Sequence, residues 1–192
     1  DFSKDYWDSY SKFNVEEQKP SFYELLGNSI PEETDTINFS SKITYGIDLD
    51  VTCQCKNLKI YFWLAEATNW LPNIFSFLEA IICAKSNELF FYLDEEGIGT
   101  FLYVKRFDNN KIRFAHLTTR SQNGDYSSEG DFKIRMDVII NEKAFIKTFY
   151  NSIINAINGI DRQEIENDWN YQLEEYEILK SGSHLIEEYL CM

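Results

Sequence analysis

The chain has 192 residues, of which 44% are hydrophobic and 16% aromatic, enough for one folded domain with a sizeable buried core. Its 32 acidic and 18 basic residues give a net charge of −14, which disfavours nucleic acid and anionic membranes and favours a basic partner. No run of about 20 apolar residues occurs, so no transmembrane helix is expected. Residues 161–192 carry 9 acids and 2 bases, so half of the net charge lies in this last segment.

The N-terminal residues 1–42 predict an irregular, partly helical arm. Aromatic side chains recur three or four residues apart near the start of the chain, a spacing typical of a helix. A short helical stretch is expected at Ser21–Leu26, because Pro20 precedes it and Gly27 follows it. The acidic residues 31–41 predict a loop. The chain begins at Asp1 rather than at Met, which indicates a processed or truncated start.

The core of the domain is expected in residues 43–158. From 43 to 55 apolar and polar residues alternate, which predicts one long strand with a buried face and a solvated face. A turn at Lys56-Asn57 should lead into a second apolar strand, Leu58–Glu66. A broad apolar stripe then predicts a helix over about Pro72–Lys85, packed against the sheet.

Short turns separate the next apolar segments, which predicts an antiparallel meander followed by helices. The expected strands are Glu88–Glu95, Thr100–Phe107, Lys111–Thr118 and Asp131–Ile140. Asn141 should cap a helix that ends at Gly159. The order ββαββββαα therefore predicts a single α+β domain over 1–192, with an antiparallel sheet of about six strands and helices packed on it. The acidic helical C-terminal segment is expected at 161–192, with a helix over Asp161–Lys180.

Paired carboxylates are the first candidate for chemistry. Asp48 and Asp50 lie two residues apart and share the non-core face of the first strand. Two such carboxylates could hold a divalent metal ion or act in acid–base catalysis. No calcium-loop spacing and no neighbouring histidine accompanies them, so a solvated strand face or a contact for a basic partner is the preferred interpretation.

The other reactive residue types favour structural interpretations. Cys53 and Cys55 lie in phase with the apolar face of their strand, which predicts two small buried side chains. His116 is in phase with Ile112 and Phe114, which predicts a residue at the edge of the core. The chain contains no P-loop, no dinucleotide fingerprint, no G-x-S-x-G and no H-E-x-x-H motif. We therefore expect no enzyme activity, no cofactor and no bound metal.

Several segments together resemble small acidic bacterial proteins of the immunity type, which are encoded beside polymorphic or contact-dependent toxins. The resemblance covers about residues 43–158 and consists of the segments IDLDV, LKIYFWL, WLPNIFSFLEAI, FFYLDEEG, FLYV, IRF and DVIINEKAFIKTFYNSI. It implies binding without catalysis to a toxin domain, often a basic nuclease. No functional residue can be transferred on this pattern.

The expected function is that of a soluble, cytoplasmic binding protein, an immunity protein that neutralises a basic toxin domain by direct contact. Tyrosine and tryptophan often anchor such interfaces, and acids steer the encounter. The alternatives are a structural or regulatory module in a larger assembly, and a metal-dependent enzyme using Asp48 and Asp50. The residues expected to contact the partner are Asp48, Asp50, Tyr45, Trp63, Tyr103, Trp169, Glu174 and Glu175.

Overall fold

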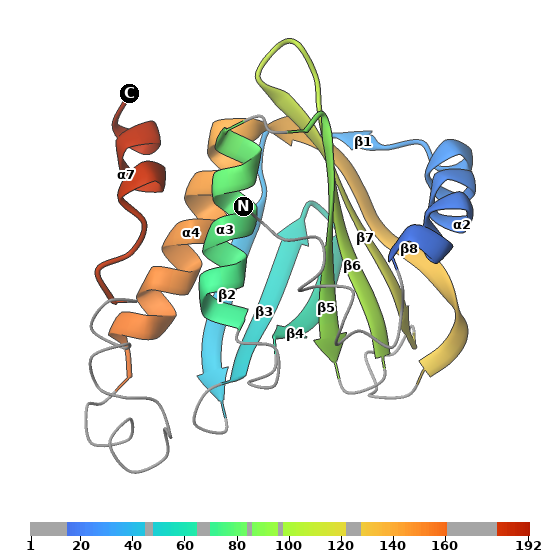
Figure 1. Ribbon diagram of the computed structural model, residues 1–192, viewed down its shortest axis with the longest axis horizontal. Helices are drawn as coiled ribbons and strands as arrows, with labels where there is room; N and C mark the ends of the chain where they lie inside the picture. The colour runs from blue at the N-terminus through green and yellow to red at the C-terminus, as the bar shows by residue number, and fades with distance from the viewer. Residues whose placement is uncertain are drawn as a thin grey trace.

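The computed structural model of this protein describes residues 15–44, 48–64, 70–83, 86–95, 98–121, 128–160 and 180–192. Within these residues the chain forms four helices and eight strands, which confirms the α+β class (Figure 1). None of the described helices is both long enough and apolar enough to cross a membrane. The helices are α2 (Val15–Asn28), α3 (Trp70–Ile82), α4 (Glu142–Asn158) and α7 (His184–Cys191).

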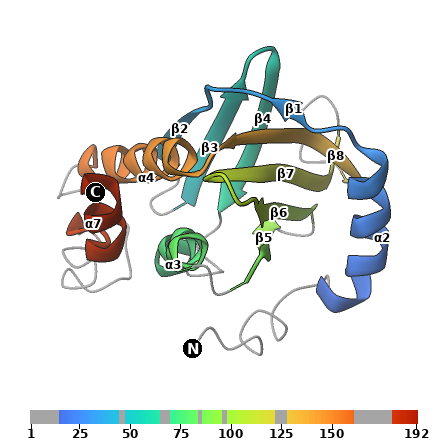
Figure 2. The same ribbon diagram turned by 90° about the horizontal axis from the view of Figure 1, so that it is seen from above.

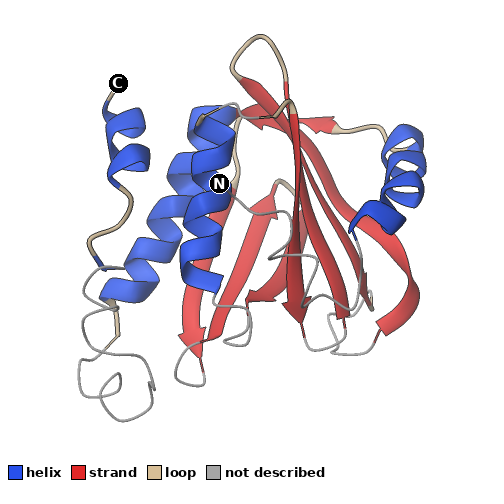
Figure 3. Ribbon diagram, viewed as in Figure 1, coloured by secondary structure: helices blue, strands red, loops and turns tan. Residues whose placement is uncertain are grey.

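The larger sheet has five strands in the order β1-β8-β7-β6-β5; the strands are labelled in Figure 1 and drawn in red in Figure 3. Strands β5 to β8 form the antiparallel meander that the sequence predicted, whereas β1 pairs with β8 in parallel. The sheet is therefore mixed. Its strands are β1 (Glu32–Glu33), β5 (Glu88–Glu95), β6 (Ile98–Arg106), β7 (Lys111–Arg120) and β8 (Ser128–Asn141).

The smaller sheet has three antiparallel strands in the order β2-β3-β4. They are β2 (Asn38–Thr44), β3 (Asp48–Cys55) and β4 (Leu58–Leu64). The prediction of one long strand from 43 to 55 is wrong, because Thr44 pairs with Asp48 and the chain has reversed direction between them. Odd-numbered residues pair with odd-numbered ones across this hairpin, for example Ile43 with Leu49. The alternation of apolar and polar residues therefore continues unbroken through the turn and conceals it.

The predicted single antiparallel sheet of about six strands is also wrong. The predicted loop 31–41 contributes β1 and the first half of β2, and the strands divide between two sheets. Helix α2 likewise differs from its prediction, because it begins at Val15 and continues through Pro20. Glu16 and Glu17 lie in its first turn, where the helix dipole favours acids. Of the predicted helix Asp161–Lys180, residues 161–179 lie outside the described residues.

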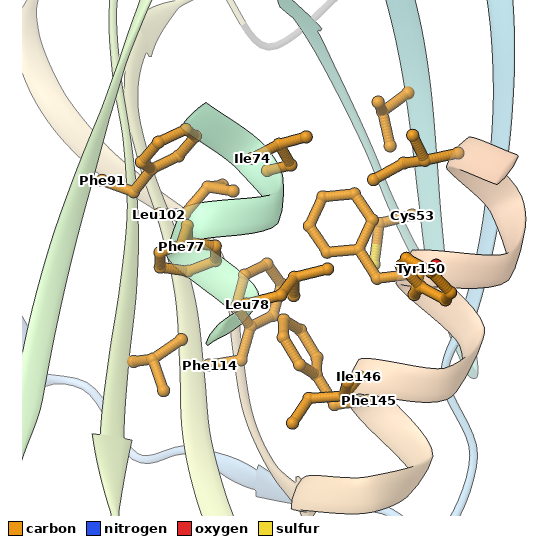
Figure 4. Packing of buried hydrophobic residues seen from close by; sticks show 14 of the residues in the cluster. Cys53, Ile74, Phe77, Leu78, Phe91, Leu102, Phe114, Phe145, Ile146 and Tyr150 are labelled. Carbon is orange, nitrogen blue, oxygen red and sulfur yellow. The ribbon is translucent and has the colours of Figure 1, made fainter. Parts of the chain in front are cut away.

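The five-stranded sheet is covered on both faces. Figure 2 shows α2 on one side of it and the three-stranded sheet, α3 and α4 on the other. Under α2, Phe22 and Leu26 pack against Phe101, Tyr103 and neighbouring side chains in a small cluster. On the other face one large cluster joins both sheets with α3, α4 and α7. Figure 4 shows the part of this cluster between the sheets, α3 and α4. This larger cluster is the main core of the molecule.

The three helices on the main core are placed by apolar contacts and by caps. Phe77 of α3 is 4% exposed and stacks on Phe91 with ring centroids 4.8 Å apart. The Asn141 side chain accepts a hydrogen bond from the Ala144 N–H and caps α4, as the sequence predicted. Helix α7 is held by Ile186, which is fully buried in the main core.

We expect the substitution Phe77→Ala to lower the free energy of unfolding by about 3–5 kcal/mol, because it leaves a cavity under α3. Chemical denaturation monitored by circular dichroism measures this change. Ser76→Ala on the same helix is the control, since Ser76 is only half-buried and should change stability by about 0.5 kcal/mol or less. Equal stability of the two variants would remove α3 from the core.

Candidate functional site

The candidate site is the face of the three-stranded sheet that points away from the main core. Side chains alternate across a strand, so the residues that pack inward on β3, such as Leu49 and Val51, leave their neighbours facing outward. Every outward residue is exposed or half-buried. We call this surface the outer face; it consists of Asn38, Ser40, Lys42, Thr44, Asp48, Asp50, Thr52, Gln54, Lys59, Tyr61 and Trp63.

The strand register brings charged and aromatic residues together on the outer face. Asp50 is paired with Lys42 on β2 and with Trp63 on β4. Side chains paired directly across strands lie about 4.5–5.5 Å apart at their Cβ atoms, so these three form one row. Tyr61 and then Lys59 follow Trp63 on the same face of β4. The Lys59 ammonium group lies 4.8 Å from the ring centroid of Tyr61. The Tyr61 side chain is 47% exposed.

This arrangement suits the recognition of basic groups. A carboxylate beside an indole can hold an amine or guanidinium by a charge-assisted hydrogen bond and by contact with the aromatic ring. Among the described residues, no three His, Cys, Asp or Glu side chains gather closely enough to hold a metal ion.

Three of the predicted contact residues lie on the outer face. They are Asp48, Asp50 and Trp63, and the last two are direct neighbours in the register. The residues Tyr45, Trp169, Glu174 and Glu175 lie outside the described residues. Lys42, Lys59 and Tyr61 also belong to this surface and were not predicted, although the period of two along β4 places Lys59 and Tyr61 on the same face as Trp63.

Tyr103 lies elsewhere and is buried. It is 2% exposed, packs in the cluster beneath α2, and donates a hydrogen bond to the Glu88 carboxylate at 3.1 Å. Burial and the charge of Glu88 raise the pKa of Tyr103 well above its ordinary value. The same carboxylate accepts a hydrogen bond from Tyr23 of α2, which raises the pKa of Tyr23 to about 12. Tyr103 therefore anchors α2, and we omit it from the partner surface.

A second unusual group lies inside the main core. His116 on β7 is 2% exposed, and neither ring nitrogen has a hydrogen-bond partner in the described structure. Its ring lies 5.9 Å from the ring of Phe62, so it faces the three-stranded sheet. Burial, together with the positive charges of Arg120 and Arg135, lowers the pKa of His116 to about 3. The side chain is therefore a neutral imidazole within the core. The sequence had predicted a residue at the edge of the core.

The comparisons with known proteins add no relative. No family model matches this chain, and neither a curated protein nor a solved structure matches it. The functional argument therefore rests on the geometry of this chain.

The buried imidazole should make the protein sensitive to acid. The pKa of His116 is lower in the folded chain, at about 3, than its ordinary value of 6.5, so the unfolded chain binds more protons between these values. The free energy of unfolding should therefore fall as pH is lowered through 6.5 toward 3, by up to about 1.4 kcal/mol per pH unit from this one group. His116→Phe should make that dependence shallower.

Urea denaturation at pH 7, 6, 5 and 4 measures this slope. The control is His184→Gln, which removes a histidine that is 86% exposed on α7. At pH 7, His116→Phe should leave the protein at least as stable as before, since it removes two buried polar atoms without partners. An unchanged pH slope in His116→Phe would contradict a neutral, buried imidazole.

Proposed function

We propose that this chain is an immunity-type binding protein that neutralises a basic protein domain by covering it with the outer face. The observation that carries the proposal is the row of Lys42, Asp50 and Trp63 beside the exposed Tyr61 ring. Partly exposed aromatic rings are the residues that most often dominate the binding energy of an interface. Here they stand on a rigid sheet, so little conformational entropy is lost when a partner binds.

Charge supports the same proposal at longer range. The outer face holds two carboxylates and two ammonium groups, so it has little net charge of its own. The chain as a whole carries −14. Long-range attraction of a basic domain therefore comes from the whole molecule, whereas the outer face supplies the specific contacts. A basic nuclease domain fits this combination, because its nucleic-acid site is positively charged.

A structural or assembly module is the second candidate. Strand β5 is at one edge of the five-stranded sheet, and β2 and β4 are the two edges of the smaller sheet. Edge strands of this kind can pair with a strand of another chain. A stable oligomer of this chain with no affinity for a basic partner would favour this candidate.

Binding kinetics against the product of the neighbouring gene test the proposed function. Trp63→Ala should raise Kd by about 30-fold or more, mainly through faster dissociation, because a central aromatic anchor contributes about 2 kcal/mol or more. The melting temperature of the free variant controls for folding. Phe107→Ala, which removes a 40% exposed ring in the β6–β7 turn, should leave binding unchanged.

A pair of charge variants separates steering from contact. Asp50→Asn and Glu24→Gln each remove one negative charge, but Glu24 is exposed on α2, across the five-stranded sheet from the outer face. Both should slow association slightly, whereas only Asp50→Asn should speed dissociation. Raising salt from 0.1 to 1 M shortens the Debye length from about 10 to 3 Å and should slow association of all variants. A salt-independent association rate, or no binding, would overturn the proposed function.

A further inference from the structure

A thiol, a thioether and an imidazole lie on the facing sides of the two sheets, and two of them are in contact. The Cys53 thiol of β3 donates a hydrogen bond to the Met136 thioether of β8, with 3.7 Å between the sulfur atoms. Met136 is paired with His116 on the adjacent strand β7, and both side chains face the three-stranded sheet. The exposed fractions are 0% for Cys53, 1% for Met136 and 2% for His116. We call these residues the sulfur–imidazole cluster.

The imidazole in this cluster is the anomaly that points to a ligand. Nearly all buried polar atoms in proteins have a hydrogen-bond partner, so a buried ring with two unpartnered nitrogens requires an explanation. His116 has none within the described chain. Because neither ring nitrogen takes part in a hydrogen bond, the imidazole has a nitrogen lone pair available for coordination. Met136, which pairs with His116 across the strands, and Cys53, which contacts Met136, supply two sulfur atoms.

We propose that Cys53, Met136 and His116 bind one Cu(I) ion between the two sheets. Thiolate, thioether and imidazole are the donors that Cu(I) prefers. On binding, the S–H bond of Cys53 breaks and its proton passes to solvent, while copper–sulfur bonds form to Cys53 and Met136 and a copper–nitrogen bond forms to His116. Copper remains in the +1 state throughout, so no oxidant or reductant is needed.

The charge balance selects a monovalent ion. One thiolate and one Cu(I) sum to zero, so the complex adds no net charge to the apolar core. A divalent ion in the same place would leave one uncompensated positive charge, which is costly in a low-dielectric interior. The positive charges of Arg120 and Arg135 near His116 oppose any further positive charge in the same place.

The spacing of the two sulfur atoms also fits. Metal–thiolate distances in proteins are about 2.3 Å for zinc, so an ion of similar size can lie between sulfurs 3.7 Å apart with a bent geometry. Because Cys53 belongs to the smaller sheet and the other donors to the larger one, the ion would tie the two sheets together. Loading should therefore accompany folding or a transient opening of the core.

The test uses the full chain with Cys83→Ser and Cys191→Ser, since these two exposed thiols would otherwise compete for the metal. The protein is refolded without oxygen in the presence of Cu(I) held by a chromophoric chelator, and the copper taken up is measured by loss of chelator colour. We expect one equivalent of copper and a raised melting temperature. The X-ray absorption spectrum of the bound copper should show both sulfur and nitrogen ligands.

Variants in the same background assign the ligands. His116→Phe and Met136→Leu should each weaken Cu(I) affinity by about 10-fold or more, by analogy with the 10–100-fold loss that even outer-shell changes cause at metal sites. Cys55→Ala is the matched control, because Cys55 is equally buried on the same strand, whereas the hydrogen bond to Met136 comes from Cys53. It should leave the affinity unchanged. Circular dichroism confirms that each variant is folded.

Three results would overturn the proposal. The first is no copper uptake beyond that of the chelator control. The second is an X-ray absorption spectrum that shows only sulfur ligands. This spectrum is recorded on the chain that keeps all three proposed ligands, so it does not depend on the folding of a ligand variant. The third is an equal loss of affinity in Cys55→Ala, which would assign the metal to a pair of thiols on β3. None of these depends on a partner protein, so the proposal stands or falls separately from the proposed function.

Discussion

The structure depends on a five-stranded sheet that is apolar on both faces. Seven consecutive residues of β6, from Ile98 to Val104, are buried, so neither face of that strand can be left in water. Burial of each large apolar side chain contributes about 1.5–3 kcal/mol, and only two separate covers can supply it on both sides. Helix α2 provides one cover, and the three-stranded sheet with α3 and α4 provides the other.

Two ion pairs, each with a buried carboxylate and a partly exposed arginine, help to fix where the covers sit. Arg113 on β7 makes two hydrogen bonds to Asp137 on β8 and a third, at 2.7 Å, to the Leu26 carbonyl of α2. On the other side, Glu142 at the start of α4 accepts hydrogen bonds from Arg106 and from Tyr189 of α7. Buried pairs of this kind add little net stability, but an unpaired member is heavily penalised. A displaced cover would leave such a member unpaired, so these pairs specify position more than they stabilise.

The sequence predicted most elements, because their evidence is local. The helix that contains Phe77 follows from its apolar period, the start of α4 from the capping residue Asn141, and the β5–β8 meander from its short turns. The sheet pairing did not follow, because pairing is decided by contacts between distant residues. The hairpin between Thr44 and Asp48 was hidden because its register preserves the alternation of faces. Part of the outer face was accessible through that same alternation, whereas the burial of Tyr103 required knowledge that α2 covers it.

Both functional proposals arise where the sequence departs from what folding alone would select. On β4, Trp63 is a large, half-buried aromatic residue on the face that points away from the core, where polar residues are common. Inside the core, phenylalanine would fill the place of His116 without leaving two polar atoms unsatisfied. Natural sequences are otherwise consistent across local propensity, packing and polar satisfaction, and exceptions tend to mark functional sites. Trp63 is on the outer face of the three-stranded sheet, whereas His116, on β7 of the larger sheet, faces the inner side of the three-stranded sheet. An ion held on the inner face would stiffen the sheet that presents the outer face, and so would reduce the entropy lost when a partner binds there.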